Sequence, residues 1–302
     1  MKIRKRVISG IIAAAIAVSP VACFAGEEQD SSAVSVYENA DMKLSIPEEY
    51  DDLLVTETPQ DDENGILFTV SEKASVDAAA EYADAEGAGW IFSIARISEE
   101  ELHDKLCFDM SGEEVFAKDE DGMYYTFNHP TDVRFVRENY ENIEEDQAQW
   151  TMLNEWAQGI VRDTFIAEND GLAAVVHSNT DLDMYLARIA YQKDVNYTIS
   201  TTEFGPMEPK DVDPTPYIDR LVNDVTFEAE PEMEAPDGEY VVLYFPDDDV
   251  RFDFFPGDGE NLVRQVWAED NEMMYKATFA DDANKASEIM QEWYLALVDA
   301  NE

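Results

Sequence analysis

The sequence is poor in cysteine, with only Cys23 and Cys107 among its 302 residues. A small scaffold stapled by disulfides is therefore excluded, and a chain of this length can bury ordinary apolar cores without them. Lys105 is the only basic residue close beside Cys107 in the sequence. Because a reactive thiolate needs a positive environment, we expect Cys107 to be a small buried apolar residue and not a nucleophile.

Basic residues are also scarce: 20 Lys and Arg stand against 68 Asp and Glu, which gives a net charge of −48. Nucleic acid is excluded as a partner, because a phosphate backbone is bound by clusters of Lys and Arg. Anionic membrane surfaces are disfavoured for the same reason. We expect most of the acids to lie outward and solvate the protein, and not to bind a specific cation.

The sequence lacks the short motifs of common hydrolytic and phosphate chemistry. It has no nucleophile-elbow serine, no aspartic-protease triplet and no glycine-rich phosphate loop. Of its three histidines, His103 follows Glu99 by one helical turn, and we expect an exposed acid–histidine pair there, because no second histidine has a metal-ligand spacing. A pair of catalytic carboxylates stays open as an alternative, since 68 acids make any single pair unremarkable.

The first 25 residues have the order of an export signal. Four basic residues lie within positions 2–6, an apolar run covers residues 7–18, and small residues follow. We expect cleavage after Ala25 and secretion of the chain. The alternative is a lipid on Cys23, because "VAC" resembles the end of a bacterial lipobox, and it would hold the chain at the outer face of the membrane. Cleavage leaves 16 Lys and Arg against 68 acids, a net charge of −52.

Two α+β domains are predicted, over residues 36–170 and 171–302, each an antiparallel sheet with helices packed mainly on one face. Residues 26–35 are polar and aperiodic, which indicates a flexible tether before the first domain. Within that domain "GWIFSIARI" predicts a central strand covered on both faces, and Ser75 fits the N-cap of a short helix that Gly87 ends. A long helix from about residue 146 to 168 is expected to bury Trp150, Leu153, Ala157, Ile160 and Val161.

In the second domain, Thr180 and Asp183 form the capping-box signature of a helix. The Pro- and Glu-rich run 228–239 indicates a loop or a further boundary. Four successive strands are centred on "YVVLYF", "VRFDFF", "LVRQVW" and "MYKATF". The chain then ends in a helix that is expected to bury Ala286, Ile289, Met290, Trp293 and Leu297.

Three consecutive aspartates, at 247–249, lie between the first two of these strands. Pro246 ahead of them favours a hairpin turn. Calcium takes about six to eight oxygens, and successive side chains of an extended segment point apart, so the triplet alone supplies too few ligands. A calcium site at Asp247 and Asp249 is kept as an alternative, in which Asp258 and Glu260 of the next turn complete the ligands.

At "GWIFSIARI", "YTFNHPTDVRF" and "VRQVWAEDNEMMYKATF", the chain resembles uncharacterised exported proteins of Gram-positive anaerobes. The opening "KLSIPEEYDDL" and the helix that ends in "DTFIA" are similar to the PsbP-like fold, over residues 36–170. That resemblance implies a small α/β module that binds or scaffolds, and fold-level analogy does not assign a function by itself.

From these observations we expect an exported, non-enzymatic protein that binds an unknown protein or small ligand at or outside the cell surface. Contact with a membrane is expected only through a lipid anchor, and no cofactor is expected apart from the calcium alternative. The competing hypotheses are a secreted hydrolase that attacks glycans or cell-wall material with paired carboxylates, and a calcium-dependent surface module.

Overall fold

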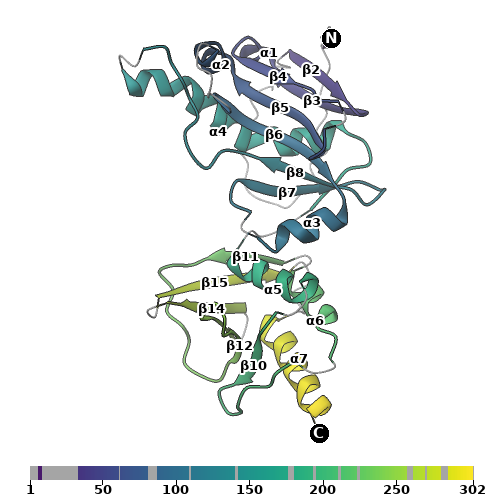
Figure 1. Ribbon diagram of the computed structural model, residues 1–302, viewed down its shortest axis with the longest axis vertical. Coiled ribbons are helices and arrows are strands. Elements are labelled where there is room, and N and C mark those ends of the chain that lie inside the picture. Colours follow the sequence, from purple (N-terminus) through teal and green to yellow (C-terminus); the bar gives the residue numbers. More distant parts are fainter. Residues whose placement is uncertain are drawn as a thin grey trace, which may run out of the picture. The chain divides into compact units, whose positions relative to one another are not determined.

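The computed structural model of the chain describes residues 6–8, 33–60, 62–80, 87–108, 110–139, 142–175, 180–192, 195–209, 212–222, 225–256, 261–268, 271–279 and 285–301. The chain divides into two compact units (Figure 1). The first holds residues up to Ser98 and residues 112–174, and the second holds residues 99–111 and 175–302. The boundary at 174 lies near the predicted one at 170, whereas residues 99–111 were expected in the first domain.

The first unit contains two sheets in which all neighbouring strands are antiparallel. In spatial order, the small sheet consists of β1 (Arg6–Ile8), β2 (Val34–Asn39) and β3 (Met42–Pro47). The large sheet consists of β4 (Leu54–Glu57), β5 (Ile66–Glu72), β6 (Trp90–Ile97), β8 (Tyr124–Asn128), β7 (Glu113–Lys118) and β9 (Ala173–Ala174). Because the ladder with β3 extends to the pair Val34–Pro47, β2 begins inside the segment expected to be a tether.

The helices of the first unit are α1 (Glu48–Asp51), α2 (Lys73–Ala79) and α4 (Ile143–Glu168). Helix α4 buries Trp150, Leu153, Ala157, Val161 and Phe165 along one stripe and packs against β3 and β6. Ile160 is 50% exposed, so its predicted burial was wrong. The reason is geometric, because adjacent helical residues point about 100° apart and Val161 already occupies the inner stripe.

Two local predictions for the first unit have different outcomes. Strand β6 is buried on both faces along most of its length and lies between β5 and β8, which confirms it as a central strand. The predicted N-cap at Ser75 was wrong, because α2 begins two residues earlier and Ser75 is buried inside it. Its side chain instead donates a hydrogen bond to Glu72.

The second unit has one six-stranded antiparallel sheet. In spatial order its strands are β10 (Thr198–Thr201), β12 (Val241–Phe245), β13 (Val250–Phe255), β14 (Asn261–Trp267), β15 (Asn271–Phe279) and β11 (Val225–Ala229). The helices are α3 (Glu99–Leu106), α5 (Asp181–Tyr191), α6 (Thr215–Val222) and α7 (Ala286–Asn301). Strands β12 to β15 pair in sequence order, so the predicted meander is confirmed, and with it the α+β fold class.

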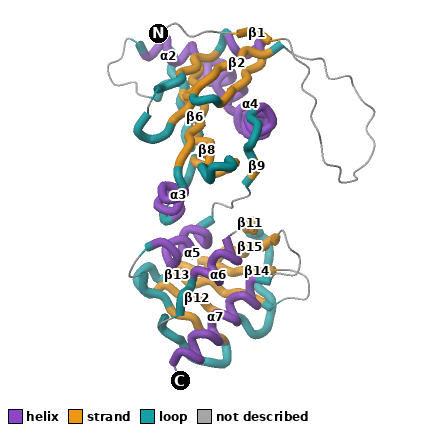
Figure 2. Tube along the Cα trace, turned by 90° about the vertical axis from the view of Figure 1, so that its right-hand side faces the viewer, coloured by secondary structure: helices purple, strands orange, loops and turns teal. Residues whose placement is uncertain are grey.

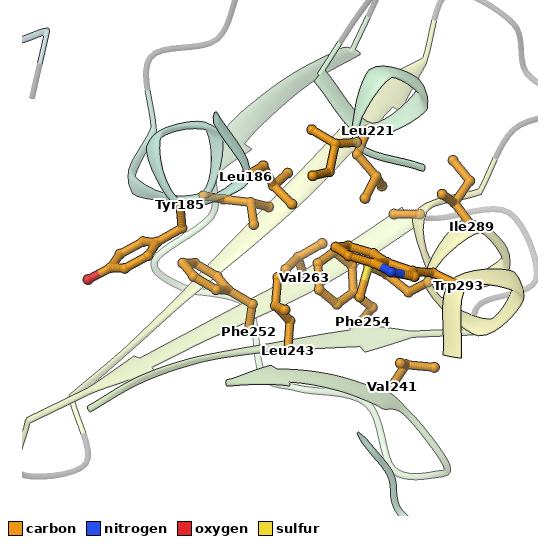
Figure 3. Close-up of a cluster of buried hydrophobic side chains, with 14 of the residues drawn as sticks. Tyr185, Leu186, Leu221, Val241, Leu243, Phe252, Phe254, Val263, Ile289 and Trp293 are labelled. Carbon is orange, nitrogen blue, oxygen red and sulfur yellow. The ribbon is translucent and has the colours of Figure 1, made fainter. Parts of the chain in front are cut away.

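Helices α5, α6 and α7 lie on one side of this sheet and share one apolar core with it (Figure 2). Phe252 and Phe254 of β13 point into that core, Phe252 toward Tyr185 of α5 and Phe254 toward Trp293 of α7 (Figure 3). All five residues of α7 predicted to be inside are buried. The capping box of Thr180 and Asp183 is present at the start of α5, with both reciprocal hydrogen bonds formed. No described helix is long and apolar enough to cross a membrane.

Helix α3 joins the second unit although its sequence lies between two strands of the first. The ring of His103 stacks on Tyr191 of α5, with centroids 3.7 Å apart and planes 9° apart. Arg188 of α5 donates a hydrogen bond from Nε to the carbonyl oxygen of Cys107 at 3.1 Å. The second unit is therefore assembled from two separate stretches of the chain.

Candidate functional site

The aspartate triplet forms the turn of the hairpin between β12 and β13, as its sequence predicts. Each carboxylate has its own partner: Asp247 accepts from Asn196 at 3.3 Å, Asp248 pairs with Arg188 at 3.2 Å, and Asp249 accepts from the Tyr244 hydroxyl at 3.1 Å. Asp249 adopts φ +52°, a left-handed conformation that Asp tolerates better than most residues. The turn is thus held by protein contacts that lead its carboxylates to different neighbours.

The other predicted site residues lie outside the described part of the chain: Asp258, Glu260, Cys23, Ala25. Within the described part, no three His, Cys, Asp or Glu side chains are grouped so that they could hold a metal ion.

The described histidines and Cys107 occupy packed positions. His129 lies 3.5 Å from the carboxylate of Glu114, and His103 is stacked on Tyr191, while His177 falls outside the described residues. Cys107 is 2% exposed, as expected. Burial, and then the charge of Asp104, raise the pKa of its thiol, which disfavours the nucleophilic thiolate.

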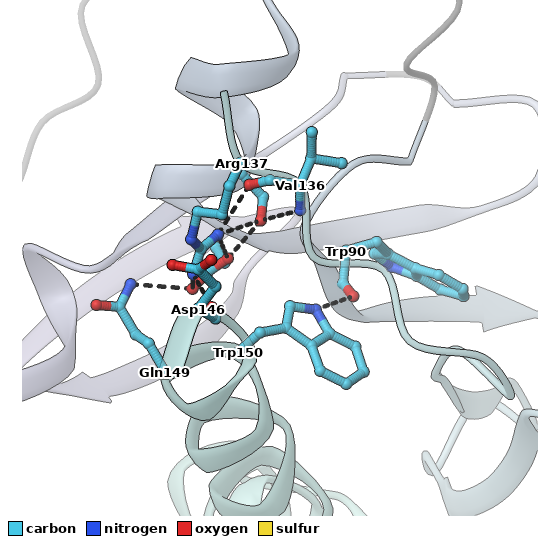
Figure 4. Close-up of polar contacts among 8 residues, drawn as sticks. Trp90, Val136, Arg137, Asp146, Gln149 and Trp150 are labelled. Carbon is cyan, nitrogen blue, oxygen red and sulfur yellow. Dashed lines mark hydrogen bonds and ion pairs between the residues drawn. The ribbon is translucent and has the colours of Figure 1, made fainter. Parts of the chain in front are cut away.

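Glu72 at the end of β5 is a fully buried acid in the first unit. Arg137 donates two parallel hydrogen bonds to the carboxylate of Glu72, from Nη1 to Oε2 and from Nη2 to Oε1, both at 2.8 Å. Gln149 of α4 donates to Oε1 at 3.0 Å from the side of Glu72 where Arg137 lies (Figure 4). Ser75 donates to Oε2. The hydroxyl of Ser75 also accepts from the backbone of Val136 at 2.8 Å. This network joins α2, α4 and the loop before α4. Because the side chains of Glu72 and Ser75 have no exposed surface, a substrate cannot reach them.

Asp253 of β13 is a fully buried acid in the second unit. Arg264 of β14 donates to its Oδ2 from Nε at 3.0 Å and from Nη2 at 2.7 Å. Its other oxygen lies 2.9 Å from Nε of Arg251 at an angle that forms no hydrogen bond. Asp253 and Arg264 face each other across adjacent strands, so the pair fixes sheet register on the face opposite the helices.

A cleft of about 500 Å³ opens at one end of the second unit, between the β10–β12 edge of the sheet and α7. Three aromatic residues line it: Phe204 after β10, Tyr240 before β12, and Tyr294 of α7. Phe204 and Leu295 are 61% and 53% exposed. The volume lies in the usual range of small-molecule sites, and apolar side chains left in water at a cavity mouth are typical of binding surfaces.

The walls of the cleft are held in place from behind. The backbone of Thr202 donates to the carbonyl of Tyr240 at 3.2 Å, and a tight turn closes with Phe204 N bonded to Thr201 Oγ1 at 3.0 Å. The Tyr240 ring packs on Phe255, with centroids 5.0 Å apart, and the Arg264 guanidinium lies 5.8 Å from its centre. Tyr294 is 5% exposed and so is fixed within the packing of α7. Such support makes the cleft largely pre-formed.

The charges at the cleft are mainly negative. Glu203, Glu239 and Glu288 line it, and Lys285 is the one basic residue among its described lining residues. All three glutamates are exposed. Exposed carboxylates keep most of their hydration, so they supply negative potential to the cleft and not the buried acid that glycoside hydrolysis requires.

Sequence reasoning missed this cleft, although two signals for it are present. Phe204 stands alone in a polar run just before Gly205 and Pro206, where a core residue is not expected. Leu295 lies off the inner stripe of α7 that the helical period predicts, and an apolar residue off that stripe is a candidate for a second contact.

Comparison of the chain with protein-family models, with curated proteins and with solved structures finds no match. The resemblances to exported proteins and to the PsbP-like fold therefore stay predictions.

Proposed function

We propose that this chain is an exported, non-enzymatic binding protein, secreted or lipid-anchored outside the cell, and that its ligand occupies the cleft of the second unit. The observation that carries the proposal is the cleft itself, a pre-formed hollow whose mouth exposes Phe204 and Leu295. The basic and apolar N-terminal segment supports export.

The hydrolase alternative gains no support from this cleft. Its glutamates are exposed, whereas the fully buried acids Glu72 and Asp253 are neutralised by Arg137 and Arg264 and are not among its lining residues. A general acid for glycoside cleavage needs a carboxyl group whose pKa is raised by its surroundings and which also reaches the substrate.

The test compares two tryptophan variants of the mature chain. Leu295→Trp fills the mouth of the cleft, and Ile160→Trp adds the same side chain at an equally exposed position on α4. Each protein is incubated with envelope extract and spent medium of the producing cells and examined by native mass spectrometry. We expect a bound small-molecule mass on the wild type and on Ile160→Trp, and its loss from Leu295→Trp.

Two outcomes contradict the proposal: no retained mass on the wild type, or a retained mass that Leu295→Trp does not affect. Mass spectrometry of the protein isolated from the native cells measures its N-terminus. A mature chain that begins at Gly26 supports secretion, a lipid-modified Cys23 supports anchoring, and an intact Met1 rules out both forms of export.

A further inference from the structure

The aromatic lining of the cleft has a chemical preference that goes beyond burying apolar surface. The faces of Tyr and Phe rings carry partial negative charge, so they attract organic cations such as ammonium groups. Tyr240 already has one such contact, because the guanidinium of Arg264 lies 5.8 Å from the centre of its ring. Phe204 presents an aromatic side chain that is 61% exposed at the mouth.

The carboxylates of the cleft act in the same direction. Glu203, Glu239 and Glu288 come from three different segments, the turn after β10, the loop before β12 and α7, and all line one hollow. Lys285 offsets only one of these charges. The net charge of the whole chain, −48, adds a long-range potential that concentrates cations and repels anions.

We propose that the cleft selects a small organic cation, an ammonium or quaternary ammonium group joined to an apolar body, with the cation between the carboxylates and the aromatic rings. The apolar body then covers Leu295 and Phe204, which water otherwise contacts. This inference rests on the proposed function and adds to it the class of ligand.

The experiment titrates the mature protein with three probes that share a benzyl group, by isothermal calorimetry at low ionic strength. Benzyltrimethylammonium is the cation, benzyl alcohol is the neutral probe and phenylacetate is the anion. We expect the cation to bind at least about tenfold more tightly than either of the others, because only the cation gains both the carboxylate and the ring contacts.

A charge-matched pair of variants locates the effect. The cleft variant carries Glu203→Gln, Glu239→Gln and Glu288→Gln, and the control carries Glu232→Gln, Glu234→Gln and Asp237→Asn, which are exposed in the connection before β12. Both remove the same net charge. We expect the cleft variant to bind the cation about tenfold more weakly and the control to lose less than about twofold.

A third variant, Phe204→Leu, keeps an apolar side chain and removes the ring. We expect it to weaken the cation severalfold and to leave benzyl alcohol unchanged. The inference is overturned if no probe binds, if the cleft variant and the control lose equally, or if the neutral or anionic probe binds as well as the cation. In the last case, Leu295→Trp shows whether the cleft is still the binding site. If it abolishes binding, the proposed function holds and only the preference for a cation fails.

Discussion

Glu72 and Asp253 are acids with no exposed surface, and each is accompanied by an arginine. A buried carboxylate pays a large desolvation cost, which is tolerable only when a partner charge and hydrogen bonds replace the lost water. Arg137 is 65 residues from Glu72 in sequence, so their pairing closes the first unit around α2 and the start of α4. These residues are understood as parts of the scaffold.

Arg137→Met tests that role. It leaves Glu72 buried without its partner charge, and we expect a loss of about 3–5 kcal/mol in the free energy of unfolding, measured by urea denaturation. Adding Glu72→Gln removes the unpaired charge and should restore most of the loss. The control is Arg220→Met, which breaks the exposed pair with Glu292 and should cost less than about 1 kcal/mol. Equal losses in the two single variants would show that the Glu72 network is not buried as described.

Glu168 at the end of α4 is a half-buried acid of a different kind. Burial raises the pKa of its carboxyl group, and Ser45 and Lys43 only partly oppose this. Its Oε2 is buried without a hydrogen-bond partner. Because the pKa of Glu168 is raised in the folded state, the folded state binds its proton more tightly than the unfolded state does. The resulting contribution to the free energy of unfolding is fully present below the unfolded pKa and is lost as pH rises through the folded pKa.

Glu168→Gln should therefore stabilise the protein at pH 7, by roughly 1 kcal/mol, the lower end of the cost of a buried unsatisfied group. The advantage should shrink as pH falls toward and below the ordinary glutamate value of 4.5. Urea unfolding at several pH values measures it, with Glu155→Gln on the exposed face of α4 as the control. A stabilisation that does not depend on pH would contradict the explanation.

At the scale of elements, short local patterns were reliable guides. The capping box at Thr180, the meander β12 to β15 and the inner face of α7 follow from spacings of three, four and two residues, which the backbone geometry imposes directly. The predictions for Ile160 and Ser75 were wrong because a neighbouring residue fits the same position as well. Val161 takes the buried position on α4, and α2 begins ahead of Ser75, and the contacts with the rest of the unit decide between such neighbours.

The β12–β13 hairpin allows a prediction about calcium binding at the scale of elements. Because Asp247, Asp248 and Asp249 already bind Asn196, Arg188 and Tyr244, we expect neither calcium nor a chelator to shift the melting temperature of the protein. Thermal unfolding followed by circular dichroism checks this. A rise in melting temperature with calcium, removed by Asp247→Asn together with Asp258→Asn, would instead establish the calcium site.

At the scale of the whole molecule, the net negative charge does not determine the fold. The sequence has 68 acids and the structure has two apolar cores, and the excess of negative charge bears on solubility and partner choice and not on the fold. The second unit takes α3 from between two strands of the first, and no sequence boundary marks this. The cleft joins a turn, two strand ends and a helix of the second unit.

The sequence by itself determined the fold class and the order of most elements, because these depend on composition and on periods of two and 3.6 residues. The tertiary structure decided the remainder: the Glu72–Arg137 pair, the place of α3, and the meeting of Phe204, Tyr240, Tyr294 and three glutamates at one hollow. The physical reason is distance along the chain. A local pattern predicts which face of an element is apolar. A site depends on which elements pack together, and those contacts form only when the core of the unit folds.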